Sequence, residues 1–365
     1  MQKDLKVLMI GSDRKLFDES SAVSERIKSY GGLVRELHVI VLTRSSSGYK
    51  ERQLSQNVWI YPTNSSTRWF YSYDAERIGK ILVKTKNFVR GQSVITTQDP
   101  FECGLAGLKI KKRWRLPLEV QVHTDPNSPY FRGFLNFIRK IIAKKVLAGA
   151  DSVRDVKTLP IYVDIDKIEN APISFDLHTR YPWRFILLAV SRLSPEKNLP
   201  LALKVLALVR NKFPNTGLVV VGSGREEGRL KNLVKKLKLD GVVEFVGWQT
   251  DLASYYKTAN VFLQTSLFEG YGMALVEAGL SGLPVVTTPV GIARELENGK
   301  DALIYPSNQP ESFAGGINDL IEHNIKRESL KVNMRRTLES KLLNKADYMA
   351  KIKENWEKTA TKIKT

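Results

Sequence analysis

Residues 267–291, LFEGYGMALVEAGLSGLPVVTTPVG, hold the pattern from which we infer the fold. Two glutamates, Glu269 and Glu277, stand eight positions apart, and Met273, Val276 and Leu280 follow a helical period. Eight helical residues rise ~12 Å over about 2.2 turns, so both carboxylates would lie on nearly one face. Small residues before this helix leave its first N–H groups open to an anion, which the helix dipole also favours. The spacing therefore predicts a diphosphate between two acids.

The spacing alone leaves a second interpretation open, a buried helix after a glycine-rich loop with glutamates that are only solvated. The residues that follow bear on this choice. Residues 282–286 (GLPVV) read as a strand entered through a proline, and Val290 and Gly291 come next. Together, residues 267–291 resemble the E-x7-E signature of the family 4 (group 1) retaining glycosyltransferases. The resemblance covers nearly all of the chain and is strongest from Phe185 to Pro306.

The resemblance implies an α/β chain of GT-B architecture, with two doubly wound Rossmann-like domains that face each other across a cleft. By this resemblance, residues 1–173 and 347–365 form the acceptor-side domain, including a returning C-terminal helix. Residues 174–346 form the domain for the nucleotide-sugar donor. A length of 365 residues with 42% hydrophobic residues suits two globular domains.

Cysteine usage and hydropathy narrow the class further. The single cysteine, Cys103, allows no internal disulfide and no cysteine-based metal cluster, and its apolar neighbours indicate a core thiol. No run of about 18 uncharged apolar residues occurs, and the opening residues lead into a strand instead of a signal peptide. We therefore expect a cytoplasmic protein that carries no cofactor and performs no redox chemistry.

A net charge of +19 calls for an anionic partner. Nucleic acid, anionic lipid and phosphorylated small molecules would all satisfy it. No zinc-finger spacing or aromatic-basic RNA-binding pattern occurs, so we expect no nucleic acid and favour a membrane surface.

Residues 130–148 (YFRGFLNFIRKIIAKKVLA) predict an amphipathic basic helix. One interpretation buries it against its own sheet with a solvated basic face. The other makes it a docking face for anionic lipid, which would hold the protein peripherally on the inner face of the cell membrane. Its apolar residues are Phe134, Phe137, Ile138, Ile141 and Ile142, and its basic residues are Arg139, Lys140, Lys144 and Lys145.

Short apolar runs alternate with helical stretches along both halves of the chain. This alternation predicts parallel sheets with helices on both faces. Near the end, Tyr348, Ile352 and Trp356 recur at i, i+4 spacing, and we expect this last helix to pack on the first domain. The runs are residues 4–10, 37–42, 58–61, 94–97, 118–122, 151–156 and 159–163, then 185–190, 218–221, 242–246, 261–264 and 302–305.

Residues just past the carboxyl ends of parallel strands lie where open α/β sheets bind ligands. Gly11 would let a ligand approach the backbone, or would simply form a tight turn. A lone histidine such as His123 is most often structural, but the resembled family carries a strand-terminal histidine here that contacts the transferred sugar. Asp99 and Asp125 are weaker candidates at strand ends.

The chain departs from the resembled family after Val156. That family has a helix and loop before the next strand, whereas this chain passes directly through Lys157 and Thr158. We therefore expect the last helix of the first domain to be missing, which affects the acceptor side. Residues 164–166 have the form of a D-x-D metal clasp but match the interdomain strand end. We assign no metal and expect sugar transfer to survive EDTA. Residues 169–183 are predicted as the linker.

In the second domain, Arg192 and Lys197 follow a strand and resemble the family's basic pair for the donor diphosphate, although such side chains are often only solvated. The sequence Gly222-Ser223-Gly224 lacks a third glycine at dinucleotide-binding spacing, so we interpret it as a turn beside the base. The donor-binding residues implied by the resemblance are Gly11, Arg192, Lys197, Gly222, Phe268, Glu269, Gly270, Tyr271, Gly272, Met273, Ala274 and Glu277.

The implied reaction moves a sugar from a UDP- or GDP-sugar to a saccharide or lipid-linked acceptor, with retention at the anomeric carbon, as in polysaccharide biosynthesis. By resemblance, Glu277 holds ribose hydroxyls, Glu269 holds the transferred sugar, and Arg192 and Lys197 neutralise the leaving diphosphate. His123 aligns the sugar. Two alternatives remain, a non-catalytic nucleotide-sugar-binding protein and a nucleotide-sugar epimerase.

Overall fold

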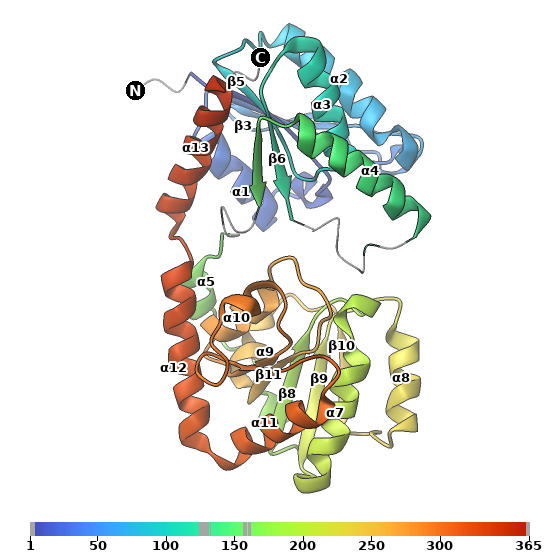
Figure 1. Ribbon diagram of the computed structural model, residues 1–365, viewed down its shortest axis with the longest axis vertical. Helices are drawn as coiled ribbons and strands as arrows, with labels where there is room; N and C mark the ends of the chain where they lie inside the picture. The colour runs from blue at the N-terminus through green and yellow to red at the C-terminus, as the bar shows by residue number, and fades with distance from the viewer. Residues whose placement is uncertain (1–3, 124–130, 132, 156–158, 160–161, 363–365) are drawn as a thin grey trace. The chain divides into compact units, whose positions relative to one another are not determined.

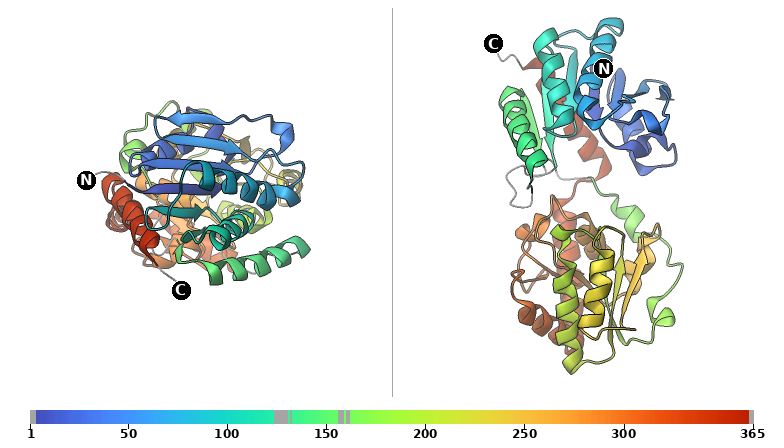
Figure 2. Two further views of the ribbon diagram at one scale, coloured as in Figure 1. Left: turned by 90° about the horizontal axis from the view of Figure 1, so that it is seen from above. Right: turned by 90° about the vertical axis from the view of Figure 1, so that its right-hand side faces the viewer.

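The computed structural model describes residues 4–123, 131, 133–155, 159 and 162–362. Its contacts divide the chain into two compact units, residues 1–161 with 345–365 and residues 162–344 (Figure 1). Each unit is an α/β structure in which helices cover a central sheet, as the two further views in Figure 2 also show.

The first unit contains a seven-stranded sheet in the order β3-β4-β2-β1-β5-β6-β7. The order reverses at β1, which pairs in parallel with both β2 and β5, so this sheet is doubly wound. Its strands are β1 (Lys6–Gly11), β2 (Glu36–Val41), β3 (Arg52–Ser55), β4 (Val58–Pro62), β5 (Ser93–Thr97), β6 (Leu118–Val122) and β7 (Ser152–Asp155). Its helices are α1 (Ala22–Gly31), α2 (Tyr71–Thr85), α3 (Glu102–Trp114), α4 (Phe134–Gly149) and α13 (Lys345–Thr361).

The predicted parallel pairing holds for the first sheet except at its edge, where β3 runs antiparallel to β4. Its sequence, RQLS, carries too little apolar character to read as a buried strand, and the structure leaves it half-buried. An antiparallel edge strand on an otherwise parallel sheet is common in α/β proteins.

At the opposite edge, β7 is the last strand of the sheet. The strand expected at residues 159–163 falls partly outside the described residues, and of its described members Leu159, Tyr162 and Val163 lie in no strand. Lys157 and Thr158 also lie outside the described residues.

The second unit contains a six-stranded parallel sheet in the order β10-β9-β8-β11-β12-β13. Its strands are β8 (Phe185–Val190), β9 (Thr216–Val221), β10 (Val243–Gly247), β11 (Val261–Gln264), β12 (Val285–Thr287) and β13 (Leu303–Ile304). Its helices are α5 (Ile165–Glu169), α6 (Leu177–Arg180), α7 (Leu199–Lys212), α8 (Glu227–Lys236), α9 (Leu252–Thr258), α10 (Met273–Leu280), α11 (Pro310–Glu322) and α12 (Asn324–Lys341).

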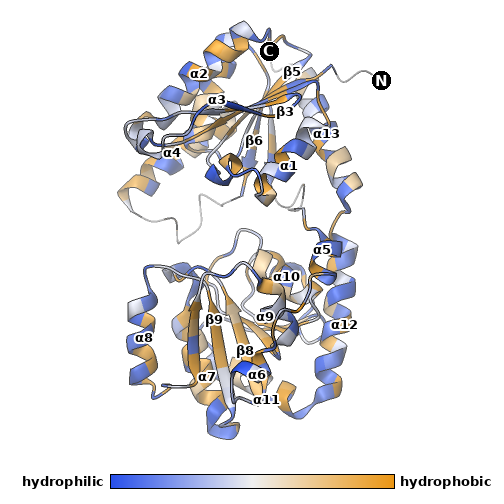
Figure 3. Cartoon of the chain, turned by 180° about the vertical axis from the view of Figure 1, so that it is seen from behind, coloured by the Kyte–Doolittle hydropathy of each residue, from blue (hydrophilic) through white to orange (hydrophobic). Residues whose placement is uncertain are grey.

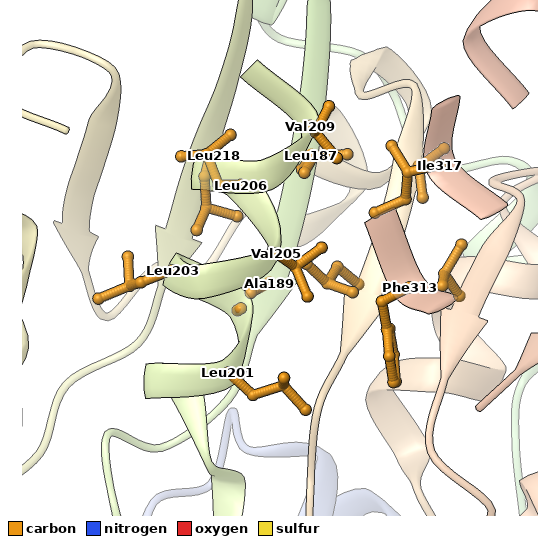
Figure 4. Close-up of a cluster of buried hydrophobic side chains, with 14 of the residues drawn as sticks. Leu187, Ala189, Leu201, Leu203, Val205, Leu206, Val209, Leu218, Phe313 and Ile317 are labelled. Carbon is orange, nitrogen blue, oxygen red and sulfur yellow. The ribbon is translucent and has the colours of Figure 1, made fainter. Parts of the chain in front are cut away.

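A buried apolar layer holds the second sheet to its helices. Val205 and Val209 of α7 lie close to Phe313 and Ile317 of α11 over the strands (Figure 4). The strands β8 and β9 are mostly hydrophobic along their length, whereas α8 and α12 alternate between hydrophilic and hydrophobic residues (Figure 3). That contrast matches strands buried on both faces and helices buried on one.

The second unit begins at Tyr162, before the linker expected at residues 169–183. The Lys257 ammonium donates to the carbonyl oxygens of Glu169 and Ala171, each at 2.6 Å. Arg335 pairs with the Glu169 carboxylate at 2.5 Å. These contacts tie α5 to the second unit, so the boundary precedes it.

The last helix, α13, belongs to the first unit and contacts β5 and β6. Its predicted stripe is present, because Tyr348, Ile352 and Trp356 are all buried. The Trp356 ring meets the Tyr30 ring edge to face, with centroids 5.7 Å apart.

The helix α4 is held to the first unit by small and branched residues, and Ala143 and Val146 are its buried side chains among the described residues. Three apolar residues that one interpretation buried against the sheet are instead exposed. Phe134 is 80% exposed, Phe137 60% and Ile141 56%. The helix α3, which α4 contacts, therefore leaves part of the apolar stripe exposed in the part of the chain that the structure describes.

Candidate functional site

A small pocket opens at the carboxyl ends of β8 and β11. The strand order of the second sheet reverses at β8, which pairs with β9 on one side and β11 on the other. Ligands of doubly wound sheets bind at this kind of switch point. The pocket is lined from β8 by Ala189 and Val190, from β11 by Phe262, Leu263 and Gln264, from the start of α7 by Leu199, and from adjoining segments by Ser191, Lys197, Thr265, Ser266 and Glu269.

Lys197 and Glu269 meet in this pocket. The Lys197 ammonium lies 2.7 and 2.8 Å from the two carboxylate oxygens of Glu269, and both side chains are largely buried. The Ser266 hydroxyl donates to Glu269 Oε1 at 2.7 Å. A cation and a carboxylate thus stand together where a phosphate and a sugar hydroxyl would each find a partner.

Ser191 and Ser266 were not among the site residues predicted from the sequence. The Ser191 hydroxyl is buried in the pocket wall and has no hydrogen-bond partner among the described residues. It directly follows the apolar run of β8, so the same strand-end argument that selected His123 would have found it. An unpaired buried hydroxyl of this kind can bond to a ligand oxygen.

Two loops are locked together around the Lys197–Glu269 pair. The Thr265 hydroxyl donates to the carbonyl oxygens of Lys197 and Asn198 at 3.2 and 3.0 Å. The Leu267 amide donates to the Glu196 carbonyl at 2.8 Å. These bonds hold Lys197 and Glu269 in position, although they stand far apart in the sequence.

The prediction that one helix carries both glutamates was wrong, because Glu269 lies outside the helix. The helix α10 begins at Met273, so Glu269 lies in the preceding loop, and the helical spacing of ~12 Å does not apply. Gly272 interrupts the helix because its φ of 100° is a left-handed conformation that favours glycine. A side chain on Gly291 would lie 2.2 Å from the Tyr271 carbonyl oxygen, so the loop is also closely packed from behind.

The remaining donor-site candidates lie on this loop and in the first turn of α10. Tyr271 and Gly272 are buried, whereas Phe268, Gly270, Met273 and Ala274 are partly exposed. The loop therefore presents backbone and side chains to solvent just before the N-terminus of α10.

Glu277 lies within α10 and accepts a hydrogen bond from the Tyr256 hydroxyl at 3.0 Å. Burial raises the pKa of Glu277, and this hydrogen bond partly opposes the rise. Tyr256 itself is buried, which fixes the orientation of the carboxylate. The second carboxylate oxygen is then the one that can accept from a ligand hydroxyl.

Arg192 differs from Lys197 in its surroundings. Its side chain is 78% exposed and lies 3.2 Å from the Glu196 carboxylate. The expected basic pair is thus one enclosed lysine and one solvated arginine on the same loop.

Gly222 and Gly224 allow the loop after β9 to press against the Arg192 loop. A Cβ on Gly222 would lie 1.9 Å from the Ser191 carbonyl oxygen, and one on Gly224 would lie 2.3 Å from that of Leu193. These glycines support the backbone that carries Arg192.

In the first unit, Gly11 ends β1 beside Gln98, whose side chain would meet a Cβ at 2.3 Å. Asp99 accepts bonds from the Phe101 and Cys103 amides, so it orders the start of α3. Cys103 is fully buried as a core thiol, and burial raises its pKa. Asp125 lies outside the described residues.

His123 follows β6 and is exposed, with its Nε2 atom 3.2 Å from Gln121 Oε1. Loss of hydration and the nearby Arg154 and Arg26 cations lower the pKa of His123, so the ring is neutral at pH 7. Because the ring is exposed, the effect of desolvation is smaller than in a closed cavity.

Residues 164–166 serve a local structural role. The Asp164 carboxylate caps α5 by accepting from the Lys167 amide at 3.1 Å. Among the described residues, no group of three or more histidine, cysteine, aspartate or glutamate side chains is arranged to hold a metal ion.

Residues 175–337 match the family model of the glycosyl transferases group 1. Over these residues, which make up most of the second unit, the chain is similar to the group 1 glycosyltransferases. The matched range contains the pocket, both glutamates, Arg192 and Lys197. The finer assignment to family 4 stays a prediction.

Curated relatives of this chain carry glycosyltransferase and glycolipid-synthase names that refer to different compounds. The chain is 27% identical to the D-inositol 3-phosphate glycosyltransferase of Pseudarthrobacter chlorophenolicus over 252 residues, and this match covers 60% of each chain. It is 27% identical over 225 residues to the alpha-monoglucosyldiacylglycerol synthase of Streptococcus pneumoniae, covering 53% of this chain and 51% of that one. The chain thus spans about half to three-fifths of these relatives.

The fold is shared over almost the whole chain with HepE (Alr3699) of Anabaena, solved in complex with UDP and glucose. The TM-score is 0.74 at 18% identity, over 96% of this chain and 98% of HepE. The expected GT-B fold, with two doubly wound domains, is therefore confirmed. Among the described residues, no helix is long and apolar enough to cross a bilayer.

Proposed function

We propose that this chain is a retaining glycosyltransferase that moves a sugar from a UDP- or GDP-sugar to a saccharide or lipid-linked acceptor. The observation that carries the proposal is the Lys197–Glu269 pair in the switch-point pocket of the matched domain. UDP is the first nucleotide to test, because HepE binds UDP and glucose.

Each residue of the site has a separate role in this proposal. Glu277, oriented by Tyr256, accepts bonds from ribose hydroxyls. Glu269 exchanges its bond with Lys197 for the hydroxyls of the transferred sugar, and Lys197 then turns to the diphosphate as negative charge develops on it. Arg192, exposed on the same loop, closes on the diphosphate from solvent. His123 accepts from a sugar hydroxyl.

A thermal-shift screen with UDP-, GDP- and ADP-sugars tests donor binding. We expect the sugars of one nucleotide to raise the melting temperature of the wild type. The same sugars should raise the melting temperature of the Glu277→Ala variant by a smaller amount. Product analysis with a saccharide acceptor then follows the anomeric configuration by NMR. Binding without turnover would favour a non-catalytic protein, and conversion of donor without acceptor would favour an epimerase; either outcome would overturn the proposal.

The first unit offers a surface that suits an anionic membrane. On α4, the exposed Phe134, Phe137 and Ile141 lie on the helix that also carries the exposed Lys144 and Lys145. Apolar and aromatic side chains beside lysines are typical of helices that lie in a membrane interface. A lipid-linked acceptor would be reached there, which fits the diacylglycerol named for one relative.

Exposed aromatic residues also lie just before and in the first turn of α2, in the same unit. Trp69 is 73% exposed and Tyr73 58%. The neighbouring Ser72 donates to the Glu102 carbonyl at 3.0 Å, while the Glu102 carboxylate pairs with Arg139 of α4 at 2.6 Å. The first turn of α3 therefore joins the two exposed regions.

Removing two lysines should weaken membrane binding. Each lysine near an anionic surface contributes about 1 kcal/mol, so Lys144→Gln with Lys145→Gln should lower partitioning roughly 30-fold. Co-sedimentation with vesicles of increasing phosphatidylserine content measures the effect, and added salt should weaken binding further. The matched control is Lys235→Gln with Lys236→Gln on α8, where two exposed lysines are also lost. Equal losses in both double variants, or binding that ignores lipid charge, would refute this surface.

A further inference from the structure

A chain of buried polar groups leads from the core of the first unit to His123. Alternate residues of a strand point to the same face, and Glu119 and Gln121 of β6 are followed on that face by His123. Glu119 is fully buried. Polar residues at these positions interrupt what would otherwise be an apolar strand, so their bonds require an explanation.

The carboxylate of Glu119 fixes the direction of the first bonds. It accepts hydrogen bonds from Arg154 Nε at 3.1 Å, from Asn355 Nδ2 of α13, and from Thr96 Oγ1 of β5 at 3.0 Å. A carboxylate paired with a guanidinium only accepts hydrogen bonds. The Thr96 hydroxyl must therefore donate its hydrogen to Glu119.

The same argument orients the amide of Gln121. The Thr96 hydrogen is already used, so Thr96 Oγ1 accepts from Gln121 Nε2 at 3.1 Å. If the Gln121 amide were flipped, its Oε1 atom would face Thr96 Oγ1, and neither oxygen would have a hydrogen to donate to the other. Gln121 Oε1 is thus directed at His123 Nε2, 3.2 Å away. An amide oxygen only accepts, which requires a hydrogen on Nε2.

We infer that Gln121 is a positioning residue that holds His123 as the Nε2-protonated tautomer, with Nδ1 as the acceptor for a ligand hydroxyl. The inference rests on the proposed function for the identity of the ligand, a sugar with a hydroxyl at that point. The low pKa of His123 supports it, since a neutral ring keeps Nδ1 unprotonated. A donor sugar that lacks this hydroxyl would leave Nδ1 without its partner.

Nitrogen NMR on the full-length protein labelled with [¹⁵N]histidine reads the tautomer directly. The chain has four histidines, and His123→Asn assigns the signal. The wild type should show Nε2 protonated. Thr96→Val removes the hydroxyl that orients Gln121 without touching the ring. It should lower the ratio of Nε2- to Nδ1-protonated ring roughly three- to tenfold, the effect of one hydrogen bond.

Thr97→Val is the matched control, because Thr97 is an equally buried neighbour that bonds the Asp99 carbonyl instead. The inference is supported if the ratio of Nε2- to Nδ1-protonated His123 falls in Thr96→Val and stays at the wild-type value in Thr97→Val. In Thr96→Val, kcat/KM for sugar transfer should fall by a similar factor. A wild-type ring protonated on Nδ1, or equal ratios in both variants, overturns it. If the tautomer is as expected but no nucleotide-sugar is bound or used, the proposed function fails and the tautomer assignment stands.

Discussion

Replacing Lys197 with alanine should lower kcat for sugar transfer by ~10²–10³, and saturating donor should not restore it. Lys197 is enclosed in the pocket and lies 2.7 Å from Glu269, so its charge is poorly screened by water. Such a preorganised cation acts most strongly on the charge that develops as the diphosphate leaves. Steady-state kinetics over a range of donor concentrations measure the effect, and Lys204→Ala, an exposed lysine of α7, is the matched control.

The Glu277→Ala variant should behave differently from Lys197→Ala. The ribose is unchanged during the reaction, so loss of Glu277 should weaken donor binding by ~1–3 kcal/mol, the value of a charged hydrogen bond, and raise the donor KM roughly 5- to 160-fold. The placement of the nucleotide would be wrong if Glu277→Ala reduced kcat as far as Lys197→Ala and left the donor KM unchanged. Arg192→Ala should act in the direction of Lys197→Ala with a smaller effect, because Arg192 is 78% exposed.

Lys197 and Glu269 should not act independently. Removing either one leaves the other without its ion-pair partner in a largely buried pocket. The double variant Lys197→Ala with Glu269→Ala should therefore cost less than the sum of the single variants. Strict additivity would mean that the pair is not formed in the enzyme before the donor binds.

Trp356→Ala should lower the free energy of unfolding of the first unit by ~3–5 kcal/mol. The indole of Trp356 is fully buried between α13 and the first sheet and packs against Tyr30. Its Nε1 group has no hydrogen-bond partner among the described residues, so Trp356→Phe should cost much less. Glu357→Ala, at the exposed next position, should change stability by no more than about 0.5 kcal/mol.

Hydrogen exchange in increasing urea separates the two units. Peptides from β1 and β5 should lose protection at lower urea in Trp356→Ala, whereas peptides from β8 and β9 should keep the wild-type midpoint. An equal shift in both sets would show that α13 does not stabilise the first unit selectively.

Much of the fold follows from local pattern. The run FILLAV coincides with β8, because strands buried on both faces are nearly continuous in apolar residues. The i, i+4 stripe likewise identified the buried face of α13. Residues near the pocket were found because the ends of such strands and the glycine-rich loop stand out in the sequence.

Tertiary structure alone decided which side chains meet. Lys197 and Glu269 pair across 72 positions, and Asn355 reaches Glu119 across 236. The exposure of Phe134 depends on how wide a face α3 can cover, and the loop position of Glu269 depends on the left-handed Gly272. The spacing of apolar residues indicates only which residues of one helix or strand share a face and which face is buried. Strand order places distant residues side by side, and this order is set by packing the whole sheet.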